Sequence, residues 1–194
     1  MDATCIRDQQ MNDDFYSQFE QSFRGQRDEI KERLQVYAPF IEPLPDAYPD
    51  FLALDLGCGR GEWLEVLGEL ELRAIGVDLD DGMLAYCRAI NLNVQTQDVI
   101  SALADPKHES VAVITAFHLV EHISFDALCR LISESLRVLK PGGLLIMETP
   151  NPENIQVGTS NFYLDQTPTR PYSGPQFLDT GLSYCPRCQD SCRV

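Results

Sequence analysis

Two histidines and a glutamate stand close together in the short segment FHLVEHI. His118, Glu121 and His122 match the letters of an inverted zinc-peptidase signature, in which two histidines of one helix bind the metal. That signature needs a sustained helix and a further ligand downstream. The helical pattern begins only at Ser124, and the remaining histidine, His108, lies upstream. The sequence therefore predicts no metal site here.

An imidazole directly after a strand has another chemical use. The apolar run at residues 111–117 predicts a strand, and ligands of open α/β sheets bind beyond the carboxyl ends of the strands. A histidine with a pKa near neutrality is the usual base for removing a proton from a hydroxyl. His118 is therefore the predicted catalytic residue. A purely structural role in the loop is the alternative.

A glycine-rich turn, LDLGCGRGEW, follows the first predicted strand. Gly57, Gly59 and Gly61 allow a sharp turn and a close ligand approach, and roughly 20 residues further on Asp78 can accept hydrogen bonds from ribose hydroxyls. The spacing Gly-x-Gly-x-Gly differs from the NAD fingerprint. Asp55, just before the turn, would repel a pyrophosphate and attract an ammonium or sulfonium. The pattern favours S-adenosylmethionine as the cofactor, while a loop-bracing role for Asp55 stays open.

Short apolar runs alternate with amphipathic ones from residue 51 onward. Strands are predicted at residues 51–57, 73–79, 93–98, 111–117 and 144–150, and helices at 61–70, 80–90 and 124–139, with a brief helical segment after residue 98. This alternation predicts an α/β fold with a Rossmann-like, doubly wound parallel sheet.

The predicted organisation has three parts. Residues 1–50 form an N-terminal helical cap, with a helix at 13–38 capped by Asn12 or Asp13 and then a stiff proline-rich linker. Residues 51–154 form the ligand-binding domain. Residues 155–194 form an irregular or truncated tail, so that the usual C-terminal strands are missing or atypical.

The composition limits the partners. A formal net charge of -15 disfavours nucleic acid and anionic membrane surfaces, and no apolar run reaches the roughly 20 residues of a membrane span. The N-terminus shows no secretion signal. An odd count of seven cysteines suits free thiols in a reducing cytoplasm. Cys185, Cys188 and Cys192 have ligand-like spacing, but incidental free cysteines are the favoured interpretation.

Five motifs in order, LDLGCGRGEWLEVL, GVDLDDGMLAYCR, QDV, FHLVEHI and LRVLKPGGLLIMETPNPEN, resemble those of class I S-adenosylmethionine-dependent methyltransferases. The closest group is the type 11/12 methyltransferases. The cofactor-binding residues that the resemblance implies are Asp55, Gly57, Gly59, Asp78, Leu79, Asp98, Val99 and Phe117.

The resemblance also implies roles for these residues. Asp55 and the glycines would line the methionine part and Asp78 would hold the ribose. Asp98 would meet the adenine amino group, with Val99 against the ring, and Phe117 would lie along the cofactor. An upstream arginine binds the cofactor carboxylate in several relatives, and Arg24 is the candidate here.

The predicted function is transfer of a methyl group to an oxygen of a small molecule or a sugar. Residues 151–171 resemble a subgroup encoded among bacterial surface-polysaccharide genes, which adds a carbohydrate acceptor as a candidate partner. An exposed sheet edge would favour a homodimer. Two alternatives remain: a truncated relative that binds the cofactor without turnover, and an NAD-dependent oxidoreductase.

Overall fold

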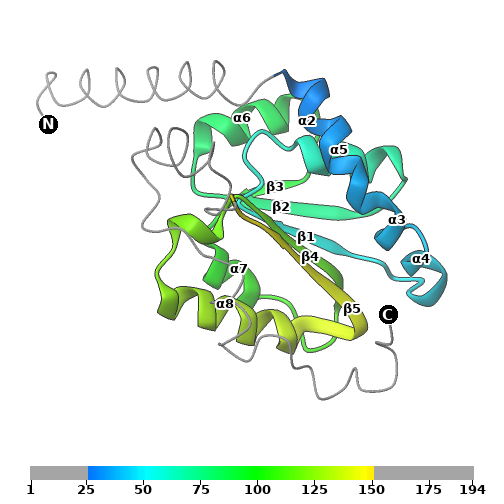
Figure 1. Ribbon diagram of the computed structural model, residues 1–194, viewed down its shortest axis with the longest axis vertical. Helices are drawn as coiled ribbons and strands as arrows, with labels where there is room; N and C mark the ends of the chain where they lie inside the picture. Colours follow the sequence, from blue (N-terminus) through cyan, green and yellow to red (C-terminus); the bar gives the residue numbers. More distant parts are fainter. Residues whose placement is uncertain (1–25, 151–194) are drawn as a thin grey trace, which may run out of the picture.

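A computed structural model describes residues 26–150 of the chain, and its element labels are those of Figure 1. The strands of this part form one parallel sheet in the order β3-β2-β1-β4-β5. They are β1 (Ala53–Leu56), β2 (Ala74–Asp78), β3 (Val94–Thr96), β4 (Val111–Phe117) and β5 (Leu139–Glu148). The strand order reverses between β1 and β4, which creates the crevice where such sheets bind ligands. The predicted fold class is confirmed.

Helices on both faces cover this sheet. They are α5 (Glu62–Glu69), α6 (Asp81–Ala89), α7 (Val99–Ala104), the 3-10 turn η2 (Val120–His122) and α8 (Phe125–Val138). The helices α7 and α8 lie on one face, and α5 and α6 lie on the other (Figure 1). The hydroxyl of Ser124 accepts a hydrogen bond from the amide of Ala127 at 3.2 Å, which confirms the predicted N-cap of α8.

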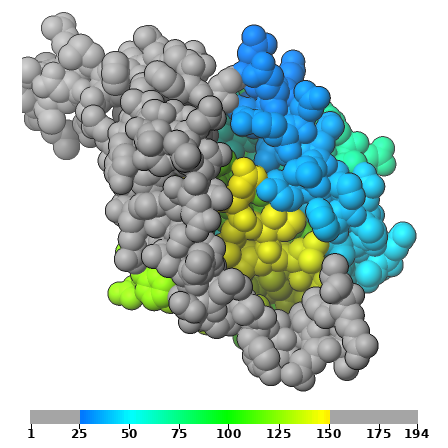
Figure 2. All heavy atoms as spheres, in the orientation of Figure 1, coloured from blue at the N-terminus to red at the C-terminus, as the bar shows by residue number. Residues whose placement is uncertain are grey.

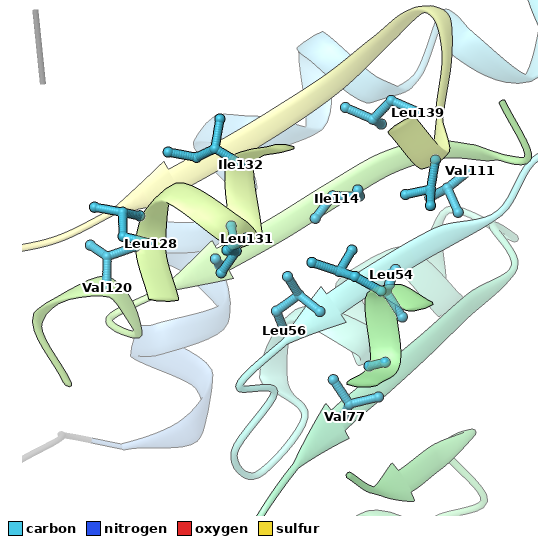
Figure 3. Close-up of a cluster of buried hydrophobic side chains, with 14 residues drawn as sticks. Leu54, Leu56, Val77, Val111, Ile114, Val120, Leu128, Leu131, Ile132 and Leu139 are labelled. Carbon is cyan, nitrogen blue, oxygen red and sulfur yellow. The ribbon is translucent and has the colours of Figure 1, made fainter. Parts of the chain in front are cut away.

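The largest hydrophobic cluster lies between the sheet and the α7–α8 layer. Leu54 and Leu56 of β1 and Ile114 of β4 belong to it, together with Leu128 and Leu131 of α8 (Figure 3). Burying one such side chain contributes about 1.5–3 kcal/mol. Strand β4 is buried on both faces, and its residues are apolar except for Thr115, as is typical of central parallel strands.

The N-terminal segment, residues 27–47, packs on α5 and the sheet. It consists of α2 (Arg27–Leu34), the 3-10 turn η1 (Gln35–Tyr37), α3 (Ala38–Ile41) and α4 (Leu44–Ala47). The prediction of a stiff linker is wrong here. Pro39 and Pro45 lie in the first turns of α3 and α4, where a helix needs no amide donor. The predicted helix start at residues 12–13 lies outside the described residues.

Strand β5 begins earlier than the sequence predicts, because the KPGG segment at residues 140–143 forms an irregular part of the strand. Leu139 pairs with Val111, and the pairing resumes at Leu144 with Val113. A Cβ at Gly143 would lie 2.8 Å from a backbone carbonyl oxygen of β4, so only glycine fits there. The predicted tail and its cysteines lie outside the described residues. The prediction that the usual C-terminal strands are missing or atypical, and the three-part division of the chain, therefore stay predictions.

Candidate functional site

The glycine turn runs from the end of β1 to the start of α5. Gly57 and Gly59 have left-handed φ angles of 72° and 52°, which a side chain would make costly. The amides of Gly57 and Cys58 both donate to the carbonyl oxygen of Val77, at 2.8 and 3.0 Å. The turn is therefore fixed against β2 at the carboxyl edge of the sheet.

The third glycine of the turn has a packing role. Gly61 begins α5 with a φ of 76°. A Cβ at this position would lie 2.6 Å from a methyl carbon of Leu92 and 3.0 Å from the sulfur of Cys87. The glycine thus lets α5 start close to the C-terminal end of α6.

Asp78 lies at the end of β2, beside the glycine turn. One carboxylate oxygen accepts a hydrogen bond from the amide of Gly59 at 2.8 Å, and the other accepts from the amide of Asp80 at 2.9 Å. Each oxygen keeps a second lone pair that could accept a hydrogen bond from a hydroxyl group. The next residue, Leu79, is 71% exposed, so its side chain can cover a ligand at this edge.

Asp55 is buried under the turn, with 3% of its surface exposed. The hydroxyl of Thr115 donates to its carboxylate at 2.6 Å. Burial raises the pKa of Asp55 to about 7, and the nearby carboxylates of Asp78 and Glu62 add to the rise. A cationic group placed beside this carboxyl would relieve that unfavourable burial.

An arginine that the sequence analysis did not single out supports the turn from outside. Arg27 of α2 donates to the backbone oxygen of Arg60, in the glycine turn, at 2.9 Å. It also lies 3.2 Å from the buried carboxylate of Glu62 and 3.0 Å from that of Glu65, and its guanidinium stacks on the ring of Tyr86. Arg24, the residue predicted to bind the cofactor carboxylate, lies outside the described residues.

Asp98 and Val99 lie at the start of α7. The Asp98 carboxylate is the N-cap of this helix, because one of its oxygens accepts from the amides of Ile100 and Ser101 at 3.0 and 3.1 Å. Hydrogen bonds from Ser101 keep the pKa of Asp98 below its usual value. Val99 is half-buried against the main core. The helix cap accounts for one oxygen of Asp98, and the predicted contact with adenine stays a prediction.

Phe117, at the end of β4, belongs to a cluster of three rings. It stacks on Tyr37 of η1 with ring centroids 5.0 Å apart, and it meets Trp63 of α5 edge-on at 5.5 Å. Tyr37 and Trp63 also meet edge-on, at 6.3 Å. The N-terminal segment therefore closes over Phe117, and the ring cluster joins it to the sheet edge.

His118 follows Phe117 in an unusual backbone conformation, with a left-handed φ of 54°. Its Nδ1 lies 3.5 Å from the carboxylate of Glu121, and its Nε2 lies 3.4 Å from that of Glu148. These two carboxylates raise the pKa of His118 to about 9, with Glu121 the larger cause. The imidazole is therefore protonated at neutral pH, and a base has to be in its neutral form to accept a proton.

The zinc signature does not have the geometry it requires. Glu121 and His122 lie in the short turn η2, not in a sustained helix. Within residues 26–150, no cluster of three or more metal-ligating side chains is arranged around a common point, and Cys58, Cys87 and Cys129 are free thiols.

These features together define a class of protein. A doubly wound sheet with a glycine turn after β1 and a carboxylate at the end of β2 is the arrangement of α/β proteins that bind an adenosine-containing ligand. The buried Asp55 favours a ligand with a cationic group near the turn. No helix in the described part of the chain is long and apolar enough to cross a membrane.

Comparison with known proteins identifies the family. A methyltransferase domain model matches residues 26–177, so the chain belongs to the methyltransferase domain family. A crystal structure of a SAM-dependent methyltransferase from Archaeoglobus fulgidus is similar with a TM-score of 0.78 and 33% identity, covering 88% of this chain and 73% of that one. The predicted resemblance to class I methyltransferases, with S-adenosylmethionine as the family's cofactor, is confirmed.

Two relatives each match about half of this chain. A probable S-adenosylmethionine-dependent methyltransferase of Mycolicibacterium smegmatis is 34% identical over 98 residues, which cover 50% of this chain and 37% of that protein. A ubiquinone biosynthesis O-methyltransferase of Methylococcus capsulatus is 32% identical over 104 residues, or 51% and 43% of the two chains. The matches thus span less than half the length of either relative.

Proposed function

We propose that this chain is an S-adenosylmethionine-dependent methyltransferase that transfers the methyl group to an oxygen of a small molecule or sugar. The observation that carries the proposal is the pairing of a buried carboxyl, Asp55, with a second carboxylate, Asp78, on either side of one glycine turn. The family match supports the proposal. Neither the buried carboxyl of Asp55 nor the family match supports the alternative of an NAD-dependent oxidoreductase.

The residues present fit this cofactor. Asp55 offers a buried carboxyl to the ammonium of the methionine part, which Gly57 and Gly59 can approach because they carry no side chain. Asp78 offers its free lone pairs to the ribose hydroxyls, and Leu79 lies next to it. On the far side of β2, Asp98 and Val99 would meet the adenine, and Phe117 would flank the cofactor from β4.

When bound, the cofactor supplies a methyl group made electrophilic by its sulfonium. The protein has to align the acceptor oxygen with that methyl and exclude water. His118 stays the proposed base for the acceptor hydroxyl. Since its pKa is about 9, it takes up that proton only in the small neutral fraction at neutral pH, or at higher pH.

The acceptor is proposed at two levels. The name of the Methylococcus relative, a ubiquinone biosynthesis O-methyltransferase, supports methylation of an oxygen on a small molecule. The sequence resemblance supports a sugar or polysaccharide acceptor as the alternative. A cytoplasmic location and a homodimer are predictions that rest on the sequence alone.

Calorimetric titration with S-adenosylhomocysteine tests the cofactor site. The parent should bind with micromolar affinity. Asp78→Ala should bind at least tenfold more weakly, because the ribose hydroxyls lose their acceptor and the Gly59 amide of the glycine turn loses its partner. The matched control is Asp46→Ala, an exposed aspartate of α4, which should bind like the parent. A folded parent that fails to bind would refute the proposal and favour a chain that has lost the function.

A further inference from the structure

Glu148 contacts His118 through both its backbone and its side chain. Its backbone oxygen accepts a hydrogen bond from the His118 amide at 2.8 Å, and its carboxylate lies 3.4 Å from the imidazole Nε2. The first contact fixes the main chain of a residue held at a left-handed φ of 54°, a strained conformation for a residue that carries a side chain. The second fixes the direction of the ring.

The same carboxylate reaches the N-terminal segment. Tyr37 of η1 donates its hydroxyl to the second oxygen of Glu148 at 2.5 Å. Burial and this bond raise the pKa of Tyr37 to about 12, so the tyrosine stays a donor. The ring of Tyr37 stacks on Phe117. Atoms of the N-terminal segment (blue) and of β5 (yellow) lie side by side in Figure 2.

Further charged groups surround this pair. From η2, the buried Glu121 faces the Nδ1 of His118 and accepts from the hydroxyl of Thr149 at 3.1 Å, and His122 lies in the same turn. From α2, Arg33 acts on Glu148 at longer range. His118 keeps the pKa of Glu148 below its usual value, so Glu148 is an anion throughout the neutral range.

We propose that Glu148 is a positioning residue for the proposed base: one of its carboxylate oxygens orients His118 at the end of β4, and the other holds Tyr37 of the N-terminal segment over Phe117. A single side chain thereby holds both the end of β4 and η1, the elements that contribute Phe117 and Tyr37 to the ring cluster. The inference deepens the proposed function, since it concerns the residue proposed as base. Its readout, however, needs neither cofactor nor acceptor.

The direct test is an NMR titration of the imidazoles in the intact chain. The chain has three histidines, and the His118 signal is the one missing from His118→Asn. In the parent, His118 should titrate near pH 9. In Glu148→Gln it should titrate at least one pH unit lower, although still above the usual value because Glu121 remains. Glu148→Asp should lie between them, and it serves if the amide variant does not fold.

Tyr37→Phe separates orientation from a general loosening of the region. It keeps the ring stack and leaves Glu148 charged, so His118 should titrate no lower than in the parent. The amide of Glu42 donates a hydrogen bond to the carbonyl oxygen of Ala38 at the end of α3. Tyr37→Phe and Glu148→Gln should each speed hydrogen exchange of this amide by about tenfold, since each removes a hydrogen bond to a charged group. Glu42→Gln, an exposed change on the same segment, should not move the His118 titration.

The outcomes are distinct. A His118 that titrates near 6.5 in the parent, or that is unmoved by Glu148→Gln, overturns the inference, and so does an equal drop in Tyr37→Phe. A parent that shows the expected titration but does not bind S-adenosylhomocysteine refutes the proposed function and leaves the positioning role standing.

Discussion

Replacing Asp55 by asparagine tests the electrostatics of the cofactor site. Burial raises the pKa of this carboxyl from 3.8 to about 7 in the folded protein, whereas the unfolded chain ionises near 3.8. Between these values the folded protein binds a proton that the unfolded chain has released. Stability therefore falls as pH rises, by about 1.4 kcal/mol per pH unit and roughly 4 kcal/mol in all.

Asparagine removes this dependence while conserving shape. Its side-chain oxygen can still accept the hydroxyl of Thr115, but it cannot ionise. Other carboxylates titrate in both proteins, so the difference between the two free energies of unfolding isolates Asp55. We expect the variant to gain roughly 4 kcal/mol relative to the parent between pH 4 and pH 7, with no further gain above pH 7.

Urea unfolding at several pH values measures this difference. Trp63, the single tryptophan of the chain, is buried and reports unfolding by fluorescence. Asp46→Asn, at an exposed aspartate, is the control and should follow the parent at every pH. A constant difference between Asp55→Asn and the parent across the range would refute the reasoning.

Three further predictions follow from the described contacts. Gly61→Ala should destabilise the protein by about 2–4 kcal/mol, because it combines a left-handed φ with a steric overlap. Gly68→Ala in α5, where a Cβ meets open space, should instead stabilise the protein by about 0.5–1 kcal/mol. Urea unfolding measures both changes in the free energy of unfolding. Arg27→Ala should cost about 2–4 kcal/mol because it leaves a buried carboxylate with one partner fewer, whereas Arg88→Ala, in an exposed pair, should cost less than about 1 kcal/mol in the same assay. If His118 is the base, the methylation rate for any accepted substrate should rise about tenfold per pH unit up to about pH 9; a rate that is flat from pH 6 to 9 would exclude it.

The parts of the fold that the sequence predicts well are those encoded locally. An apolar run such as residues 111–117 indicates a buried strand wherever it occurs, and a glycine turn followed by an acid indicates the ligand edge of a sheet. The structure places Asp55 and Asp78 on either side of one turn, as the motif implies.

Contacts between distant segments were not predictable in this way. Arg27 meets the glycine turn and Tyr37 meets Glu148 only because α2 and η1 pack against elements far along the chain. No periodicity or motif marks such pairs. The raised pKa of His118 has one local cause and one distant cause. Glu121, the larger cause, lies three positions along the chain, but the contribution of Glu148, thirty positions away (148 − 118), could not be read from the neighbours of His118 in the sequence.

Asp78 limits how this protein could change its ligand during evolution. The carboxylate proposed for the ribose also holds the amide of Gly59, and so supports the turn itself. A substitution that would suit a different ligand therefore removes a support of the loop in the same step. Ligand preference and folding are thus inherited together at this position, and a switch of specificity would first require another residue to take over the bond to Gly59.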